Sequence, residues 1–187
     1  ASTDLTRVVC PEVEAERVLA INGGAPAVFG PRDRVTLSPG GRRAYVVRAN
    51  ASTLEAYELA VPSSEARQHP LGTGSLLAAS DHFAVIATGS SLAVWDPATD
   101  TTLDAGAALL SAGPSERAVI TSGPTPLIAV EDARKVWQVF RIANGTIQMV
   151  DLLIASPERV ELLAAGERIV TTTRTGLAVR DLGSAMD

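Results

Sequence analysis

The side chains that most often carry catalysis are scarce in this chain of 187 residues. It has two histidines, His69 and His82, and one cysteine, Cys10, too few for the common zinc sites or an internal disulfide. No Gly-x-Ser-x-Gly or His-Glu-x-x-His motif occurs, and Lys135 follows Arg134 where a phosphate-binding loop needs glycine. The sequence therefore assigns no catalytic residue, no metal site and no bound cofactor.

Carboxylates are more numerous, but they stand where the chain is expected to turn, at Asp81, Asp96, Asp100, Asp132 and Asp181. Aspartate accepts backbone N–H groups in turns, which explains these positions without catalysis. An enzyme of the hydrolase, lyase or lactonase type, with an axial carboxylate or metal site, stays open as the alternative. Such a site is assembled from separate repeats, so sequence spacing would not reveal it.

One cluster of charged residues could bind a partner. Its members lie within seventeen residues whose only acid is Asp33, and they are Arg32, Arg34, Arg42, Arg43 and Arg48. Guanidinium groups suit carboxylates or phosphates on a partner, although solvated arginines at turns would have the same pattern. Nucleic acid is not an expected partner, because the net charge is −5 and aromatic residues make up 4% of the chain.

Short strands must position these residues. A sequence pattern typical of a strand, apolar and with an aromatic residue, recurs along the chain. Anchored on Tyr57, Trp95, Phe140 and Arg180, its copies are separated by 38, 45 and 40 positions. A period of about 40 residues built from short strands is typical of β-propeller blades. We therefore predict an all-β, β-propeller-like fold of about four four-stranded antiparallel blades. Trp95, Trp137 and Tyr57 are expected to pack between blades, or to act as interface anchors if exposed.

The repeats divide one domain of residues 1–187 into units. These are an N-terminal strand and partial blade (1–31), three blades (32–72, 73–109 and 110–155) and an incomplete fourth blade (156–187). The last unit lacks an outer strand, and an open sheet edge invites unwanted pairing. We expect Thr6–Cys10 to complete it alongside the strand from Leu177 to Asp181. Otherwise the chain is part of a larger propeller.

Two segments carry a resemblance to a known family. The stretch from Leu92 to Leu103 resembles the blade repeat of quinoprotein-like and YVTN-type bacterial β-propellers. The stretch from Leu37 to Val46 resembles their Ser-Pro-Asp-Gly hairpin, with Gly40 in place of the aspartate. The resemblance implies a propeller fold, which hosts dehydrogenases, lyases, sensors and scaffolds alike. The Gly and Trp of the quinone-binding members are missing, so it implies no quinone.

These observations predict a non-enzymatic protein-interaction or ligand-sensing module of a bacterial envelope or multi-protein assembly. A protein partner is expected, and self-association or a further chain covering the sheet edges stays open. No apolar run approaches the roughly 18 residues of a membrane helix, so no membrane span is expected. One lysine among 16 basic residues suggests a GC-rich bacterial genome. The compartment is left open, with a bacterial extracytoplasmic setting slightly favoured over a cytoplasmic one.

Overall fold

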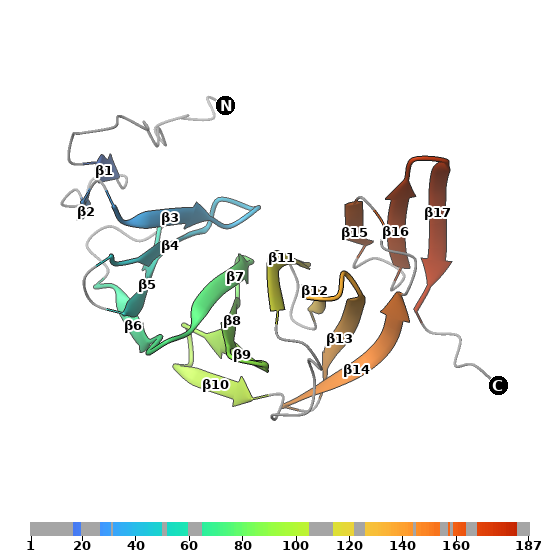
Figure 1. Cartoon of the computed structure of the whole chain (residues 1–187). Coiled ribbons are helices and arrows are strands. Elements are labelled where there is room, and N and C mark those ends of the chain that lie inside the picture. The colour runs from blue at the N-terminus through green and yellow to red at the C-terminus, as the bar shows by residue number, and fades with distance from the viewer. Residues whose placement is uncertain are drawn as a thin grey trace, which may run out of the picture. The chain divides into compact units, whose positions relative to one another are not determined.

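The computed structural model describes residues 17–19, 27–30, 32–49, 52–59, 65–104, 114–121, 126–143, 145–153, 157, 159–163 and 168–182. All regular structure within these ranges is β-strand (Figure 1). The strands form four antiparallel sheets and one two-stranded hairpin. The chain divides into two compact units, Ala1–Gly72 and Thr73–Asp187.

The first unit contains a hairpin and a four-stranded sheet, called the first sheet below. The hairpin pairs β1 (Arg17–Leu19) with β2 (Ala27–Phe29). The first sheet has the order β3 (Arg34–Leu37), β4 (Arg43–Val47), β5 (Thr53–Glu58) and β6 (Arg67–Pro70). Phe29 packs with Ala44, Val46 and Leu59, so the hairpin and the first sheet share one core.

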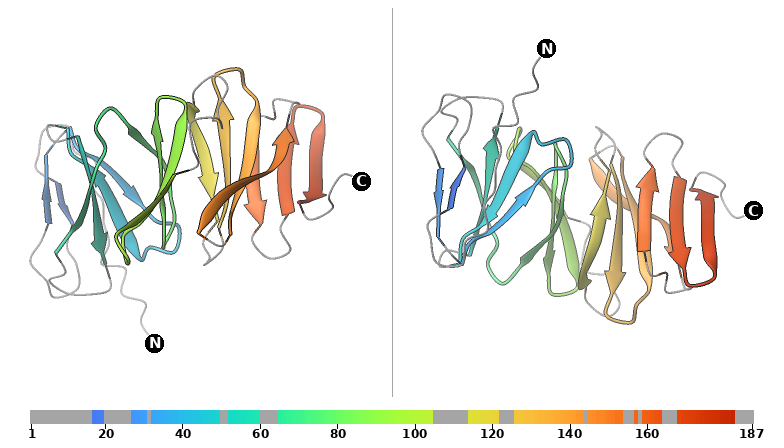
Figure 2. Two further views of the ribbon diagram at one scale, coloured as in Figure 1. Left: turned by 90° about the horizontal axis from the view of Figure 1, so that it is seen from below. Right: turned by 90° about the horizontal axis from the view of Figure 1, so that it is seen from above.

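The second unit contains three sheets. The second sheet consists of β7 (Ser75–Ala79), β8 (Ala84–Thr88), β9 (Ser91–Asp96) and β10 (Thr101–Asp104). The third consists of β11 (Pro114–Ile120), β12 (Leu127–Asp132), β13 (Trp137–Ala143) and β14 (Thr146–Leu153). The fourth has β15 (Arg159–Leu163), β16 (Arg168–Thr173) and β17 (Gly176–Asp181), which lie side by side in Figure 2.

Two cores hold the second unit together, one on each face of the third sheet. Ile128, Val130 and Phe140 pack against the second sheet, in a core that includes Val85, Ala87, Leu92 and Val94. Ala129 and Val139 point the other way and pack with Val160 and Ile169 of the fourth sheet. Because successive side chains of a strand alternate between faces and both faces are covered, the first four residues of β12, Leu127 to Val130, are all apolar. Trp95 and Trp137 are both buried, which fits packing between sheets.

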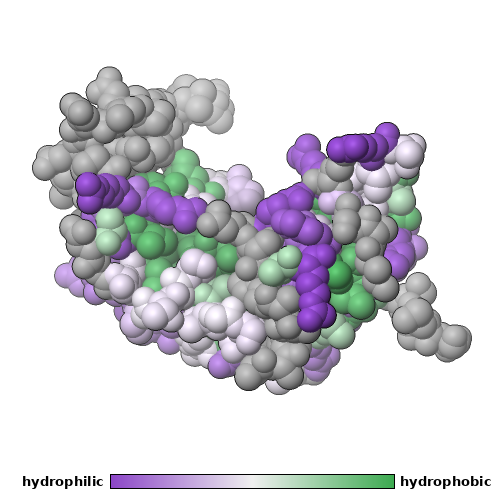
Figure 3. All heavy atoms as spheres, in the orientation of Figure 1, coloured by the Kyte–Doolittle hydropathy of each residue, from purple (hydrophilic) through white to green (hydrophobic). Residues whose placement is uncertain are grey.

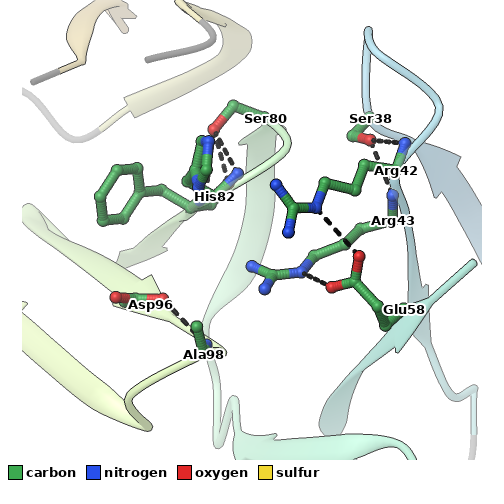
Figure 4. Close-up of polar contacts among 9 residues, drawn as sticks. Ser38, Arg42, Arg43, Glu58, Ser80, His82, Asp96 and Ala98 are labelled. Carbon is green, nitrogen blue, oxygen red and sulfur yellow. Dashed lines mark hydrogen bonds and ion pairs between the residues drawn. The ribbon is translucent and has the colours of Figure 1, made fainter. Parts of the chain in front are cut away.

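A buried hydroxyl residue follows the first strand in each of three sheets. Ser38, Ser80 and Thr121 hold these positions, and each hydroxyl oxygen accepts a backbone N–H from the start of the second strand. The donors are Arg43 to Ser38 (2.9 Å), Phe83 to Ser80 (3.0 Å) and Leu127 to Thr121 (2.9 Å). Figure 4 shows this contact at Ser38 and Ser80. The hydroxyl satisfies a buried donor where the strand ladder is interrupted by the turn.

The dipeptide His69-Pro70 has the sequence of a connection, but it ends β6, where a proline without an N–H is tolerated at the end of an edge strand. The fourth sheet has three strands among the described residues. The segment Thr6–Cys10, expected to supply its outer strand, lies outside the described residues.

Candidate functional site

Arg42 and Arg43, two of the five predicted arginines, lie at the turn between β3 and β4 and share one carboxylate. Arg42 Nε donates to Glu58 Oε1 at 3.0 Å, and Arg43 Nε donates to Glu58 Oε2 at 2.9 Å (Figure 4). Glu58 stands directly opposite Arg43 in the β4–β5 ladder, a position at which opposite charges attract. The Arg43 side chain is 8% exposed and that of Arg42 is 55% exposed. Arg42 is therefore the solvent-facing member of the pair.

Arg48 follows β4 and is the centre of a separate network. Its Nη1 donates to Asp33 Oδ2 and its Nε to Glu55 Oε2, both at 2.8 Å. Its Nη2 donates to the Tyr57 hydroxyl at 3.1 Å, and Tyr57 donates in turn to Glu55 at 2.7 Å. The guanidinium carbon lies 5.2 Å from the centroid of the Phe29 ring, within the range of a cation–π contact. Arg48 thus links β2, β4 and β5 within the first unit.

The surroundings of this network favour its charged form. Burial opposes the charge of Asp33, but the N–H groups of Gly30 and Ala49 and the Arg48 guanidinium outweigh it and lower the pKa of Asp33. Burial opposes the charge of Arg48 as well, yet its carboxylate partners raise the pKa of Arg48. Burial and the hydrogen bond to the neighbouring carboxylate raise the pKa of Tyr57 to about 12. These shifts keep the ion pairs charged and the phenol neutral.

Arg32 and Arg34 are exposed at the start of the first sheet. Arg34 stands opposite Val47, next to Arg48, whereas Arg42 and Arg43 lie at the other end of the same hairpin. The structure therefore separates the five arginines into two groups instead of one patch. Binding of a partner by these arginines stays a prediction.

A different surface becomes visible when β9 and β17 are compared. β9 has the sequence Ser-Leu-Ala-Val-Trp-Asp and β17 has Gly-Leu-Ala-Val-Arg-Asp. Leu92 and Val94 of β9 are 2% and 1% exposed and pack in the core between the second and third sheets. The matching Leu177 and Val179 of β17 are 66% and 55% exposed. The same apolar residues are thus buried in one sheet and uncovered in the other.

Leu177 and Val179 belong to one face of the fourth sheet, which we call the open face. They pair with Thr172 and Val170 of β16, which point the same way because side chains alternate along a strand. Ile169, which precedes Val170 along β16, points to the opposite face and to the core shared with the third sheet. In the view of Figure 3, hydrophobic and hydrophilic spheres lie side by side on the surface of the described residues.

Two ion pairs flank the apolar centre of the open face. Arg168 Nε lies 2.6 Å from Asp181 Oδ1, and Arg159 Nη2 lies 2.7 Å from Glu161 Oε1. All four side chains are at least 49% exposed. An apolar centre with a charged rim is the usual anatomy of a protein–protein interface. Sequence reasoning placed Leu177 and Val179 in a repeat but did not identify this surface, although their position in the last repeat was the available signal.

The opposite face of the same sheet borders a cavity of about 370 Å³ between β14, β16 and β17. Leu152 and Leu153 of β14 line one side, and Ile169 of β16 and Ala178 of β17 line the other. At its rim Arg180 of β17 donates to Asp151 of β14, which ties the fourth sheet to the third. The lining is mostly apolar, as is common for pockets that bind ligands or side chains.

A buried acid lies within the third sheet. Glu131 has a side chain 2% exposed, and it accepts from Arg117 Nη1 at 3.0 Å and from Lys135 Nζ at 3.5 Å. The Arg117 guanidinium lies 5.2 Å from the centroid of a Trp137 ring. Because buried charges need partners, this cluster has a structural explanation. Elsewhere in the described residues, no group of three or more histidine, cysteine or acidic side chains could hold a metal ion.

Among the residues that the structure describes, no helix is long and apolar enough to cross a membrane. No protein-family model matches the chain, and no curated protein matches it. Solved structures do match it.

The dihydro-heme d1 dehydrogenase NirN, in complex with DHE, matches 92% of this chain with a TM-score of 0.50 and 19% identity. A chain from an S. cerevisiae assembly of Dbp5 with Nup159, Gle1, IP6 and ADP matches 88% of it, with a TM-score of 0.43 and 13% identity. The chain spans 41% of the first matched chain and 57% of the second. NirN has a β-propeller-like fold, and a likeness at this identity concerns the fold alone. Together with the four antiparallel sheets, it shows that this chain is all-β and β-propeller-like.

Proposed function

We propose that this chain is a non-enzymatic protein-interaction module whose partner packs on the open face of the fourth sheet. The observation that carries the proposal is the contrast between β9 and β17. Leu92 and Val94 are buried by a neighbouring sheet, whereas Leu177 and Val179 occupy the same places in the repeat and are 66% and 55% exposed. β17 therefore has the sequence of a strand whose face is covered.

The energetic argument favours covering this face. Full burial of a leucine or valine side chain stabilises by about 1.5–3 kcal/mol. With more than half of each side chain exposed, covering Leu177 and Val179 would contribute about 2–3 kcal/mol in total. A specific interface buries roughly 1,200–2,000 Å², so the partner must also extend over the flanking ion pairs.

The partner that fits is a β-sheet with an aliphatic and aromatic face. The third sheet offers an internal example, because it covers Leu92 and Val94 with Ile128, Val130 and Phe140. Sheet faces pack about 10 Å apart with interdigitating side chains, which suits the flat rows of the open face. Charged groups at the rim of the open face would then set the orientation of the partner.

We extend the proposal to the setting of the protein. It would be a bacterial propeller of the quinoprotein-like or YVTN type, extracytoplasmic, and part of an envelope or multi-protein assembly. The exposed arginines of the first sheet, Arg32, Arg34 and Arg42, would be a second contact for acidic groups of such an assembly.

Site-specific photo-crosslinking in the cells that make the protein tests the interface. A benzoylphenylalanine at Leu177 should give one discrete adduct, whose partner peptide is an apolar strand of a β-sheet. The same group at Met149 is the matched control, because Met149 is also apolar and is 54% exposed, but lies on β14. Adding Val179→Asp to the chain that carries benzoylphenylalanine at Leu177 should abolish the adduct.

Three results would overturn the proposal. They are equal labelling from Leu177 and Met149, an adduct that survives Val179→Asp, and no adduct at all. An adduct between two copies of the chain would replace the protein partner with self-association, which sedimentation velocity would confirm independently.

A further inference from the structure

The turn between β12 and β13 holds Lys135, the one lysine of this 187-residue sequence. Asp132 fixes the turn, because its Oδ1 accepts the N–H groups of Arg134 and Val136, both at 2.9 Å. Its carbonyl oxygen accepts the N–H of Lys135 at 3.0 Å, and the φ of Lys135 is 67°. The Lys135 side chain is 61% exposed. The turn therefore presents a primary amine to solvent from a defined backbone position.

The ammonium group of Lys135 is paired with a buried acid. Its Nζ lies 3.5 Å from Glu131 Oε2, and Arg117 Nη1 lies 3.0 Å from Glu131 Oε1. The Glu131 side chain is 2% exposed, and a buried charge needs partners of opposite sign. Lys135 thus supplies part of the positive charge that compensates a buried carboxylate.

Glu131 lies beside the core that joins the third and fourth sheets. It stands directly opposite Trp137 in the β12–β13 ladder, and residues directly opposite each other share one face of a sheet. Trp137 packs with Val160 and Ile169 of the fourth sheet. A loss of charge at Lys135 would therefore act, through Glu131, at the border of this core.

Lysine differs from the other basic residues of the chain in the chemistry of its nitrogen. All of those others are arginines, whose guanidinium stays protonated. A lysine amine can instead be acylated, which removes its charge. Arg134, the preceding residue, is exposed, and a guanidinium suits a phosphate group. An acyl phosphate would therefore meet both a nucleophile and a phosphate-binding cation at this turn.

We propose that Lys135 is a site of acetylation by an acyl phosphate, and that acetylation loosens the packing of the third sheet on the fourth. The Lys135 nitrogen attacks the carbonyl carbon, the C–N bond forms, and the C–O bond to phosphate breaks. Phosphate leaves with the bonding electron pair. The ammonium gives up two protons, one to the leaving phosphate and one to solvent. The amide product is neutral, so Glu131 keeps only Arg117 of these two cations.

Acetyl phosphate and the purified chain test the chemistry. Peptide mapping should find an acetyl group at Lys135, and the same adduct should occur in the chain isolated from the cells that make it. Arg134→Met should slow the reaction about threefold, the size of an exposed charge interaction. Arg174→Met, at the exposed turn between β16 and β17, is the matched control and should not slow it. No adduct in either preparation, or equal rates in the two variants, would overturn the inference.

Urea denaturation of the acetylated chain tests the consequence. Its unfolding constant should exceed that of the unmodified chain by about 2- to 5-fold, the range for an ion pair with an exposed member. Lys135→Gln, which is neutral, should match the acetylated chain, and Lys135→Arg should match the parent. In a Glu131→Gln chain the acetyl group should have no effect. An unchanged unfolding constant, or the same rise in Glu131→Gln, would show that Glu131 does not read the charge of Lys135.

The two tryptophans locate the change within the second unit. The indole NMR signal of Trp137 should shift on acetylation, and that of Trp95, which donates to Asp100, should stay in place. Equal shifts of both signals would contradict a local effect on the core between the third and fourth sheets. The inference does not rest on the proposed function, and none of these results bears on the crosslink from Leu177, so the two proposals fail separately.

Discussion

Replacing Arg48 by methionine should strongly destabilise the first unit. The change removes three hydrogen bonds, to Asp33, Glu55 and Tyr57, and leaves two carboxylates whose side chains are 10% and 11% exposed. Breaking a fully buried ion pair costs about 3–5 kcal/mol. The Arg48 side chain is 24% exposed, so solvent screening lowers the expected loss to about 2–4 kcal/mol. Arg34→Met is the matched control and should change the free energy of unfolding by less than about 0.5 kcal/mol.

Urea denaturation can follow the two units separately. Both tyrosines, Tyr45 and Tyr57, lie in the first unit, and both tryptophans, Trp95 and Trp137, lie in the second. Arg48→Met should therefore lower the urea midpoint of the tyrosine absorbance signal. The tryptophan fluorescence midpoint should move less. The reasoning is refuted if the decrease in the free energy of unfolding for Arg48→Met lies within about 0.5 kcal/mol of the change for Arg34→Met.

The pH dependence gives an independent check on the same network. The pKa of Asp33 is lowered in the folded state, so its stabilising contribution is complete above the ordinary value of 3.8. That contribution is lost as the pH falls through the folded-state pKa. Without Arg48 the lowering is smaller, so the variant should lose less stability than the parent on acidification below about pH 4. An equal acid loss in both chains would show that Arg48 does not hold the charge of Asp33.

Two further substitutions test buried polar contacts of the second unit. Ser80→Ala should cost about 1–2 kcal/mol, because it leaves the partly buried N–H groups of His82 and Phe83 without this acceptor. Ser75→Ala, at the exposed first residue of β7, should be neutral in the same urea titration. Arg117→Met should lower the free energy of unfolding by about 1–3 kcal/mol, because Glu131 stays buried without its closest cation. The substitution should also alter Trp137 fluorescence, because the guanidinium leaves the indole ring. Unchanged emission and unchanged stability would contradict the cation–π contact and the ion pair.

The strands were predictable from sequence because apolar runs and turn residues alternate at a regular period. β6 was missed, since His69-Pro70 reads as a connection and only the position of the proline at an edge permits a strand. The hydroxyl residues Ser38, Ser80 and Thr121 recur at separations of 42 and 41 positions and could have been found.

The arginine cluster shows a limit of sequence reasoning. Arg42, Arg43 and Arg48 belong to a stretch of sequence whose only acid is Asp33. The sequence alone therefore suggests that most of their charges are not neutralised. Their partners Glu55 and Glu58 are on the next strand, and only the register of β4 with β5 brings the opposite charges together. Proximity in sequence says little about pairing across a ladder, because the carboxylate partners of these arginines on β5 lie 7 to 16 residues away.

The fourth sheet is where the residues and their surroundings disagree most. Natural edge strands are commonly short or carry charges and proline, and β6 and β10 follow this rule with four residues each. β17 has six residues, no proline and an apolar Leu-Ala-Val centre. Among the described residues no sheet covers Leu177 and Val179, although β17 also carries the charged Arg180 and Asp181. Its apolar centre thus matches that of β9, whose equivalent residues are buried, and this contrast is the argument for a partner on the open face.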